Sequence, residues 1–226
     1  LGERPPGPAS LLVVGDVDFG GDPGAGKLAG EVAGRIRAGG PLTWKPLEAT
    51  VAEARTIEEL FRKTQPGSAV QSLRRGEATE AAIRRTAGHH RYLHFATHGF
   101  FDDSMASPQT DPKPDGLLDR VRRRVEPNPG LLCGLVCAGA NAPTVDDDGV
   151  LTALEIADLD LSGAELAVLS ACETGLGKLA GRDGVLGLQR AFQLAGTRTT
   201  VTSLWRVPDQ ATGALMVRFY ENRLSR

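Results

Sequence analysis

Two short stretches of the chain end in a reactive side chain that is followed closely by glycine. Residues 93–99 read LHFATHG and residues 168–175 read VLSACETG. Each predicts a buried apolar strand, with His98 closing the first and Cys172 closing the second. Sites in open α/β sheets lie at the carboxyl ends of the strands, so two such neighbouring strands would bring the imidazole and the thiol together. An imidazole beside a thiol is the minimum that a cysteine nucleophile requires.

Cys172 stands where a turn open to solvent is expected. Glu173, Thr174 and Gly175 follow it directly. A reactive thiolate needs partial exposure and a basic neighbour, which His98 would supply. A free cysteine is also often a small buried residue, and the pattern alone leaves that alternative open.

The glycine after the histidine has a physical use. The N–H groups of Gly99 and Cys172 can donate to the oxygen of a tetrahedral intermediate, and a Cβ at position 99 would crowd the scissile carbonyl. The alternative is a plain turn glycine at a strand end. His94, inside the same strand, is predicted to be a hydrogen-bonded core histidine rather than a second catalytic group.

Strands alternate with helices along the chain, which predicts an α/β fold with a mostly parallel sheet flanked by helices. Caps support two of the helices: Thr79 is a good N-cap, and Thr152 with Glu155 forms a capping-box pattern. Helices are expected at residues 49–63, 79–88, 152–159, 185–194 and 209–222, and strands at 10–14, 68–73, 92–97, 131–137, 165–171 and 198–204.

The length and composition fit one domain. The chain has 226 residues, of which 41% are hydrophobic. Residues 1–9 are rich in proline and glycine and predict a linker, so the domain is expected over residues 10–226. Residues 102–130 are rich in Asp, Pro and Arg without periodicity, which predicts an exposed insertion.

Charge and cysteine usage exclude several classes of partner. A formal net charge of −2 gives no reason to expect nucleic acid or an anionic membrane surface. No run approaches the ~18 apolar residues of a membrane span. Three cysteines give no disulfide framework, which favours a reducing cytoplasm. No pair of ligands has metal-binding spacing, so no metal is expected.

Residues 21–27, GDPGAGK, match the pattern of a phosphate-binding loop. Leu28 stands where the Mg²⁺-binding hydroxyl belongs, and Pro23 removes a backbone donor from the cradle. Nucleotide binding is therefore a rival that these two residues argue against.

Several longer motifs resemble one family in their order and content. They are HFATHGFFD at 94–102, GLVCAGAN at 134–141, DGVLTALE at 148–155, LSACETG at 169–175, GVLGL at 184–188 and SLW at 203–205. Together they resemble the CHAT-domain proteins, which are related to caspases, separases and gingipains. The resemblance runs from about residue 10 to residue 220.

The resemblance implies a caspase-like (caspase–hemoglobinase) three-layer fold and an intracellular cysteine endopeptidase. His98 matches the family's catalytic histidine and Cys172 its nucleophile, with no metal or organic cofactor. Family members are often fused to tetratricopeptide repeats, so a repeat region or partner outside this chain is expected to relieve a latent state. Relatives usually continue past the last helix, so the C-terminal end of the family domain is expected to be missing here.

The resemblance also implies a protein or peptide substrate bound along residues 200–206. That strand would add the substrate to its edge, with Ser203 and Trp205 beside it and Asp209 just beyond. Trp205 has core packing as its alternative, and Asp209 the first turn of a helix, where acidic residues are favoured. A rival for the whole chain is a catalytically idle protein-interaction module, against which the intact His98 and Cys172 argue.

Overall fold

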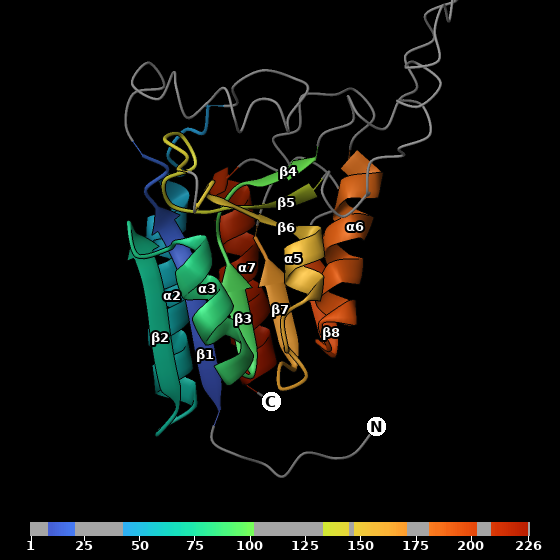
Figure 1. The fold of residues 1–226 in the computed structure, drawn as a ribbon. Helices are drawn as coiled ribbons and strands as arrows, with labels where there is room; N and C mark the ends of the chain where they lie inside the picture. The colour runs from blue at the N-terminus through green and yellow to red at the C-terminus, as the bar shows by residue number, and fades with distance from the viewer. Residues whose placement is uncertain are drawn as a thin grey trace, which may run out of the picture.

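A five-stranded parallel sheet forms the centre of the molecule (Figure 1). The structure, a computed structural model, describes residues 9–20, 43–101, 133–144, 147–170, 181–202 and 209–225. Neighbouring strands of this sheet pair in parallel throughout. The strands, in spatial order, are β2 (Ala69–Arg75), β1 (Ser10–Val17), β3 (Tyr92–Phe95), β7 (Leu166–Leu169) and β8 (Thr199–Thr202).

Helices cover both faces of this sheet, because successive side chains of a strand point to opposite sides. Leu11 and Val13 of β1 pack in one core cluster with α2 (Ala49–Thr64) and α7 (Asp209–Leu224). Leu12 and Val14 enter the other cluster. That cluster holds α3 (Glu80–Thr86), the 3₁₀ turn Ala87–His89, α5 (Ala153–Ala157) and α6 (Gly181–Leu194). The predicted α/β fold with a mostly parallel sheet between helical layers is confirmed and is consistent with a caspase-like fold.

A second, antiparallel sheet lies beyond the carboxyl ends of the parallel strands (Figure 1). It consists of β4 (Gly99–Phe101), β5 (Cys133–Val136) and β6 (Val150–Thr152). The sequence did not predict this sheet. The backbone N–H of Val136 donates to the His98 carbonyl over 2.8 Å, so the small sheet is tied to the segment that leaves β3.

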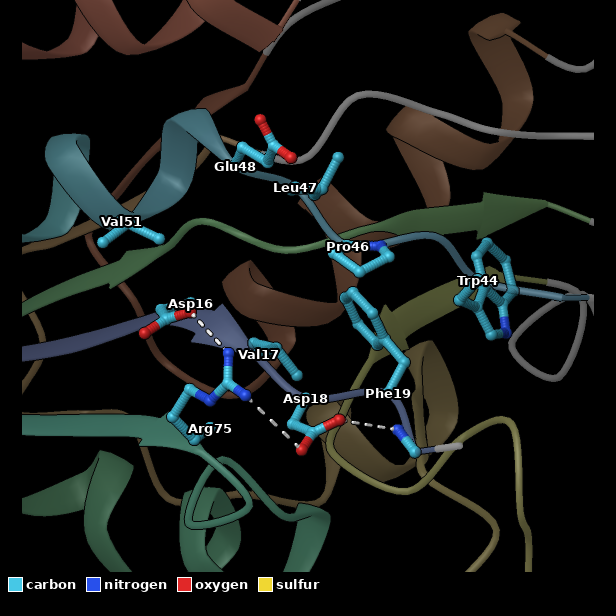
Figure 2. Close-up of a pocket in the computed structure, with 11 residues that line it drawn as sticks. Asp16, Val17, Asp18, Phe19, Trp44, Pro46, Leu47, Glu48, Val51 and Arg75 are labelled. Carbon is cyan, nitrogen blue, oxygen red and sulfur yellow. Dashed lines mark hydrogen bonds and ion pairs between the residues drawn. The ribbon is translucent and has the colours of Figure 1, made fainter. Parts of the chain in front are cut away.

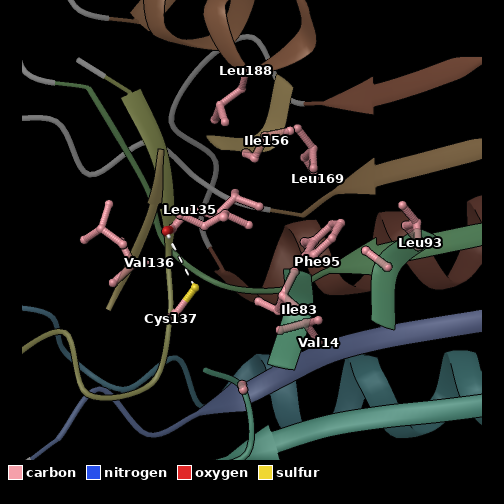
Figure 3. Close-up of a cluster of buried hydrophobic side chains, with 14 of the residues drawn as sticks. Val14, Ile83, Leu93, Phe95, Leu135, Val136, Cys137, Ile156, Leu169 and Leu188 are labelled. Carbon is pink, nitrogen blue, oxygen red and sulfur yellow. Dashed lines mark hydrogen bonds between the residues drawn. The ribbon is translucent and has the colours of Figure 1, made fainter. Parts of the chain in front are cut away.

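The two sheets share one core (Figure 3). Phe95 of β3 and Leu169 of β7 belong to the same buried cluster as Leu135 of β5. The ring centroids of Phe95 and Phe192 are 5.6 Å apart, which joins the sheet to α6. Fully burying a side chain of this size contributes about 1.5–3 kcal/mol, so the small sheet is fixed to the large one by packing as well as by hydrogen bonds.

Local caps fix the helix starts as the sequence predicts. Thr79 Oγ1 accepts from Ala82 N at the start of α3. Thr152 and Glu155 form the reciprocal capping box at the start of α5. Gly196, after α6, has a φ of 105°, a backbone conformation that favours glycine.

Several sequence predictions lie outside the described residues. They are the phosphate-loop pattern at 21–27, the insertion at 102–130, Cys172, Ser203 and Trp205. Among the described residues no helix is both long and apolar enough to cross a membrane.

Candidate active site

The strands that precede the two predicted reactive residues, β3 and β7, are neighbours and end side by side. The strands pair in parallel, with Phe95 opposite Leu169. The N–H of Ser170 then donates to the Phe95 carbonyl over 2.9 Å, so the two chains still run side by side one residue further on. His98 comes three residues after Phe95, and Cys172 comes three residues after Leu169.

The imidazole of His98 is buried, with 6% of the residue exposed. Its Nε2 lies 2.7 Å from the backbone carbonyl oxygen of Lys45. Because a carbonyl only accepts hydrogen bonds, Nε2 must carry the hydrogen of this bond. In the neutral ring, Nδ1 is then the nitrogen that can take up a proton, as a general base must.

Two aromatic rings pack against the imidazole of His98. The centroid of the His98 ring is 5.0 Å from that of Phe19 and 5.3 Å from that of Trp44. Phe19 follows β1 and Trp44 precedes α2, so both ends of the β1–α2 connection reach His98. Phe19 and Trp44 are themselves buried, at 3% and 4% exposure, and therefore restrict how the imidazole can turn.

Asn141 ties these two loop ends together. Its Oδ1 accepts from Trp44 N over 2.8 Å, and its Nδ2 donates to Trp44 O over 2.9 Å and to Gly20 O over 3.3 Å. Its own backbone N–H donates to Phe19 O over 2.7 Å. Asn141 therefore fixes the walls around His98 without contacting the imidazole through any of these bonds.

Sequence reasoning missed both Asn141 and the Lys45 carbonyl. Asn141 ends one of the motifs that carry the family resemblance, residues 134–141, and that motif is its only signal in the sequence. The Lys45 carbonyl had none, because every residue carries the same backbone group.

Gly99 begins β4 and pairs with Leu135 of β5. The residue is therefore part of a strand in the small sheet rather than a simple turn. Thr97, just before it, donates from Oγ1 to the Val136 carbonyl over 2.6 Å, which further anchors the segment. The proposed role of the Gly99 N–H as an oxyanion donor stays a prediction.

The two cysteines that the structure describes do not suit a nucleophile. Cys133 and Cys137 are both buried, each at 1% exposure. Burial raises the pKa of the Cys137 thiol far above its usual range, which keeps that thiol protonated. Cys172 lies outside the described residues, so its exposure and its role stay predictions.

His94 lies in the core, as predicted. Its Nε2 is 3.0 Å from Glu53 Oε1 of α2, and both side chains are almost fully buried. Its ring meets that of Tyr220 edge-on, with centroids 5.5 Å apart. His94 is therefore a structural histidine between β3, α2 and α7.

The predicted substrate-binding residues stay predictions. Asp209 is the first residue of α7, a place where helix geometry alone favours an acidic residue. Ser203 and Trp205 lie outside the described residues, just after β8. Within the described ranges, no group of three His, Cys, Asp or Glu side chains is arranged to hold a metal ion.

Comparison with known proteins adds a family to this geometry. Two curated relatives are both called Tetratricopeptide repeat protein 28. The one from Mus musculus is 26% identical over 189 residues and the one from Homo sapiens 26% identical over 194 residues. Each match covers 80% of this chain but 7% of the relative. The family model described as CHAT domain matches residues 2–226, and the chain therefore belongs to the CHAT-domain family, in the caspase-like peptidase clan.

Proposed function

We propose that the chain is a cysteine endopeptidase in which His98 and Cys172 act as a dyad. The observation that supports this most strongly is the parallel register of β3 and β7, with Phe95 opposite Leu169. Each of the two residues follows its strand by three positions. The bond from His98 Nε2 to Lys45 O adds a second support, because it leaves Nδ1 as the proton-accepting nitrogen.

The reaction follows from these roles. His98 Nδ1 takes the proton of the Cys172 thiol, and the thiolate attacks the peptide carbonyl carbon. The N–H groups of Gly99 and Cys172 donate to the oxyanion that forms. His98 then gives its proton to the leaving amine as the C–N bond breaks, and a thioester remains. Water, deprotonated by His98, cleaves the thioester and restores the thiol.

The substrate lies along β8 in this proposal. Among the described strands β8 is at one end of the parallel sheet, next to β7, so its outer edge can pair with an extended peptide. Ser203 and Trp205, which follow β8, would line the residues before the cleaved bond. Asp209 would pair there with an arginine or lysine side chain. Asp209→Ala should then lower kcat/KM for basic substrates far more than for apolar ones, and a uniform loss would contradict this pocket.

The chain is also proposed to be latent until a regulatory region or partner acts on it. Its curated relatives are tetratricopeptide repeat proteins, and the chain spans 7% of their length. A repeat region would activate the site by binding its active conformation more tightly than its inactive one. The cytoplasmic location, the absence of a cofactor and the domain limits at residues 10–226 remain part of this proposal.

Covalent labelling tests the dyad directly. The chain is incubated with a peptide-based thiol-reactive probe until the adduct no longer grows. Intact mass at successive times gives the rate, and peptide mapping locates the adduct. We expect one adduct, on Cys172, whose rate falls in His98→Ala and is unchanged in Cys137→Ala, where a buried thiol is removed. A chain that forms no adduct on Cys172 would favour an interaction module, and an equal rate without His98 would refute the dyad.

A further inference from the structure

A cavity lies between the end of β1 and the segment before α2 (Figure 2). Its volume is about 240 Å³. Phe19 and Trp44 line it and also pack against the His98 ring. Val17, Leu47 and Val51 extend the apolar lining. The cavity and the imidazole therefore share two side chains.

Three carboxylates and one guanidinium line the same cavity: Asp16, Asp18, Glu48 and Arg75. Figure 2 shows Arg75 between the two aspartates. Arg75 Nη1 is 3.4 Å from Asp16 Oδ1, and its Nη2 is 3.9 Å from Asp18 Oδ2. The side chain of Arg75 is 68% exposed and that of Asp18 51%. Such long, exposed ion pairs hold their partners weakly, so another cation can take the place of Arg75.

The walls of this cavity are already fixed. Asn141 bonds both main-chain groups of Trp44 and the carbonyl of Gly20, so the two loop ends cannot move apart freely. Asp16 and Arg75 each have a φ of 51°, and they are the non-glycine residues with left-handed backbone among those described. Asp16 stands at the irregularity in the β1–β2 pairing, which aims the chain out of the regular sheet there. A preformed pocket of apolar walls with a few convergent charges is the usual form of a ligand site.

The sheet order decides which part of a substrate would reach this cavity. β1 lies on one side of β3 and β7 on the other. In the proposed reaction the acyl half of the substrate stays on Cys172, which follows β7 in the chain. The amine half leaves with a proton from His98, which follows β3. In that reaction, the residues that follow the cleaved bond would depart across His98 toward the end of β1, where the cavity lies.

We propose that this cavity is a subsite for a lysine or arginine side chain on the carboxyl-terminal side of the cleaved bond. Asp16 and Asp18 would pair with the cation, and Phe19 and Trp44 would contact the aliphatic stem. In the absence of substrate, Arg75 forms ion pairs with both aspartates. This subsite rests on the proposed peptidase function, and it differs from the Asp209 pocket, which would receive a residue before the cleaved bond.

Binding is tested without catalysis. In the ¹⁵N-labelled full chain carrying Cys172→Ala, the indole N–H signal of Trp44 is titrated with acetyl-Gly-Arg-Gly amide and with acetyl-Gly-citrulline-Gly amide, its neutral counterpart. The arginine peptide should bind more tightly by about fivefold for each carboxylate engaged. Asp18→Asn should remove most of that difference, whereas Asp158→Asn, at an exposed aspartate that ends α5, should keep it.

Cleavage is tested with a peptide library and the wild-type chain, reading both sides of each cleaved bond by mass spectrometry. Lysine and arginine should be enriched after the bond, and Asp16→Asn with Asp18→Asn should abolish the enrichment. Asparagine tolerates the left-handed backbone at position 16, so the fold should survive. Arg75→Asn removes the internal competitor and should strengthen the enrichment, which a merely structural effect would not do.

The outcomes separate the two proposals. Selective binding of the arginine peptide by a chain whose Cys172 takes up no thiol-reactive probe supports a site for basic side chains in this cavity and refutes the peptidase. Cleavage that depends on Cys172 but shows no basic preference after the bond refutes the subsite and leaves the peptidase standing. Equal affinity for the arginine and citrulline peptides also overturns the subsite.

Discussion

Two histidines only four positions apart occupy opposite kinds of environment. His94 lies within β3 and is 0% exposed, with its Nε2 bonded to the carboxylate of Glu53. His98 lies beyond the strand end, with its Nε2 bonded to the Lys45 carbonyl. Both rings touch aromatic side chains, Tyr220 for His94 and Trp44 for His98. The difference between them is therefore the partner and the place in the strand, not the residue type.

That difference separates a structural histidine from a candidate catalytic one. Around His94, three polar atoms are buried and have no hydrogen-bond partner among the described residues: His94 Nδ1, Glu53 Oε2 and the Tyr220 hydroxyl. Burial raises the pKa of Tyr220 far above its usual range, so its hydroxyl stays neutral there. The His94 ring is 0% exposed, so a substrate could not contact it in this structure. Sites in α/β sheets lie beyond the carboxyl ends of the strands, and His98 lies beyond the end of β3.

Replacing each histidine should affect peptide cleavage very differently. His98→Ala should lower kcat for peptide cleavage by about 10²–10⁴-fold, the usual contribution of a general acid–base group. Cys172→Ala should reduce cleavage to background, and the double variant should be little worse, because groups that act as one unit are not additive. His94→Gln, assayed at equal folded concentration, should keep most of the activity. Equal losses in His94→Gln and His98→Ala would refute the distinction.

The free energy of unfolding should depend on the partner of His94. Glu53→Ala leaves the buried His94 Nε2 without its hydrogen-bond partner, so it should lower the free energy of unfolding by about 1–3 kcal/mol. Glu59→Gln, on the exposed side of α2, should change it by no more than about 0.5 kcal/mol. Replacing the pair together, with Glu53→Leu and His94→Phe, should recover most of the loss. Urea unfolding measures all three, and a Glu53→Ala variant as stable as Glu59→Gln would contradict the role of the pair.

Asn141 tests whether the residues around His98 position its imidazole. Asn141→Ala removes its side-chain bonds to Trp44 and Gly20, so the walls that hold the imidazole should loosen. We expect kcat to fall by about tenfold or more, with a loss of about 1–2 kcal/mol in stability. Asn141→Asp keeps the acceptor for Trp44 N but loses the N–H donors. Its kcat should therefore lie between those of the wild type and Asn141→Ala. Asn222→Ala, at an exposed asparagine of α7, serves as the control. A kcat unchanged in Asn141→Ala would show that the walls do not position His98.

The parts of the fold that sequence could predict are those with local causes. The apolar stripe of α2 and the caps at Thr79 and Thr152 depend on residues within one or two turns, and the structure agrees with them. Helix α6 begins at Gly181 rather than at the expected residue 185, because its first turn contains glycines and no apolar stripe to mark it. The strand expected at 131–137 is found as β5, but its antiparallel pairing with β4 and β6 was not predicted, since three-residue strands paired across distant segments leave little local pattern.

The residues of the candidate site also fall into two groups, those with a local sequence signal and those without one. His98 and Cys172 could be proposed from strand-end motifs, because the order of elements implies neighbouring parallel strands. The Lys45 carbonyl, the rings of Phe19 and Trp44, and the clamp from Asn141 come together only through tertiary packing. Sequence therefore suffices to propose the reacting groups, while the groups that surround His98 required the structure.

The smallest effect concerns a third histidine, His90, which lies just before β3. It is buried, its Nδ1 is 3.0 Å from the Thr86 carbonyl, and burial lowers its pKa below the ordinary value of 6.5. As the pH falls below 6.5, the unfolded chain takes up a proton that folded His90 resists, so stability should decline through that window and level off below the folded pKa. His90→Gln should remove this part of the decline between about pH 7.5 and about pH 5, whereas His89→Gln, at the exposed neighbour, should leave most of it. Urea midpoints across this range measure the slope. An unchanged slope in His90→Gln would mean that His90 is protonated in the folded chain as readily as in the unfolded one, and that burial before β3 does not act on it.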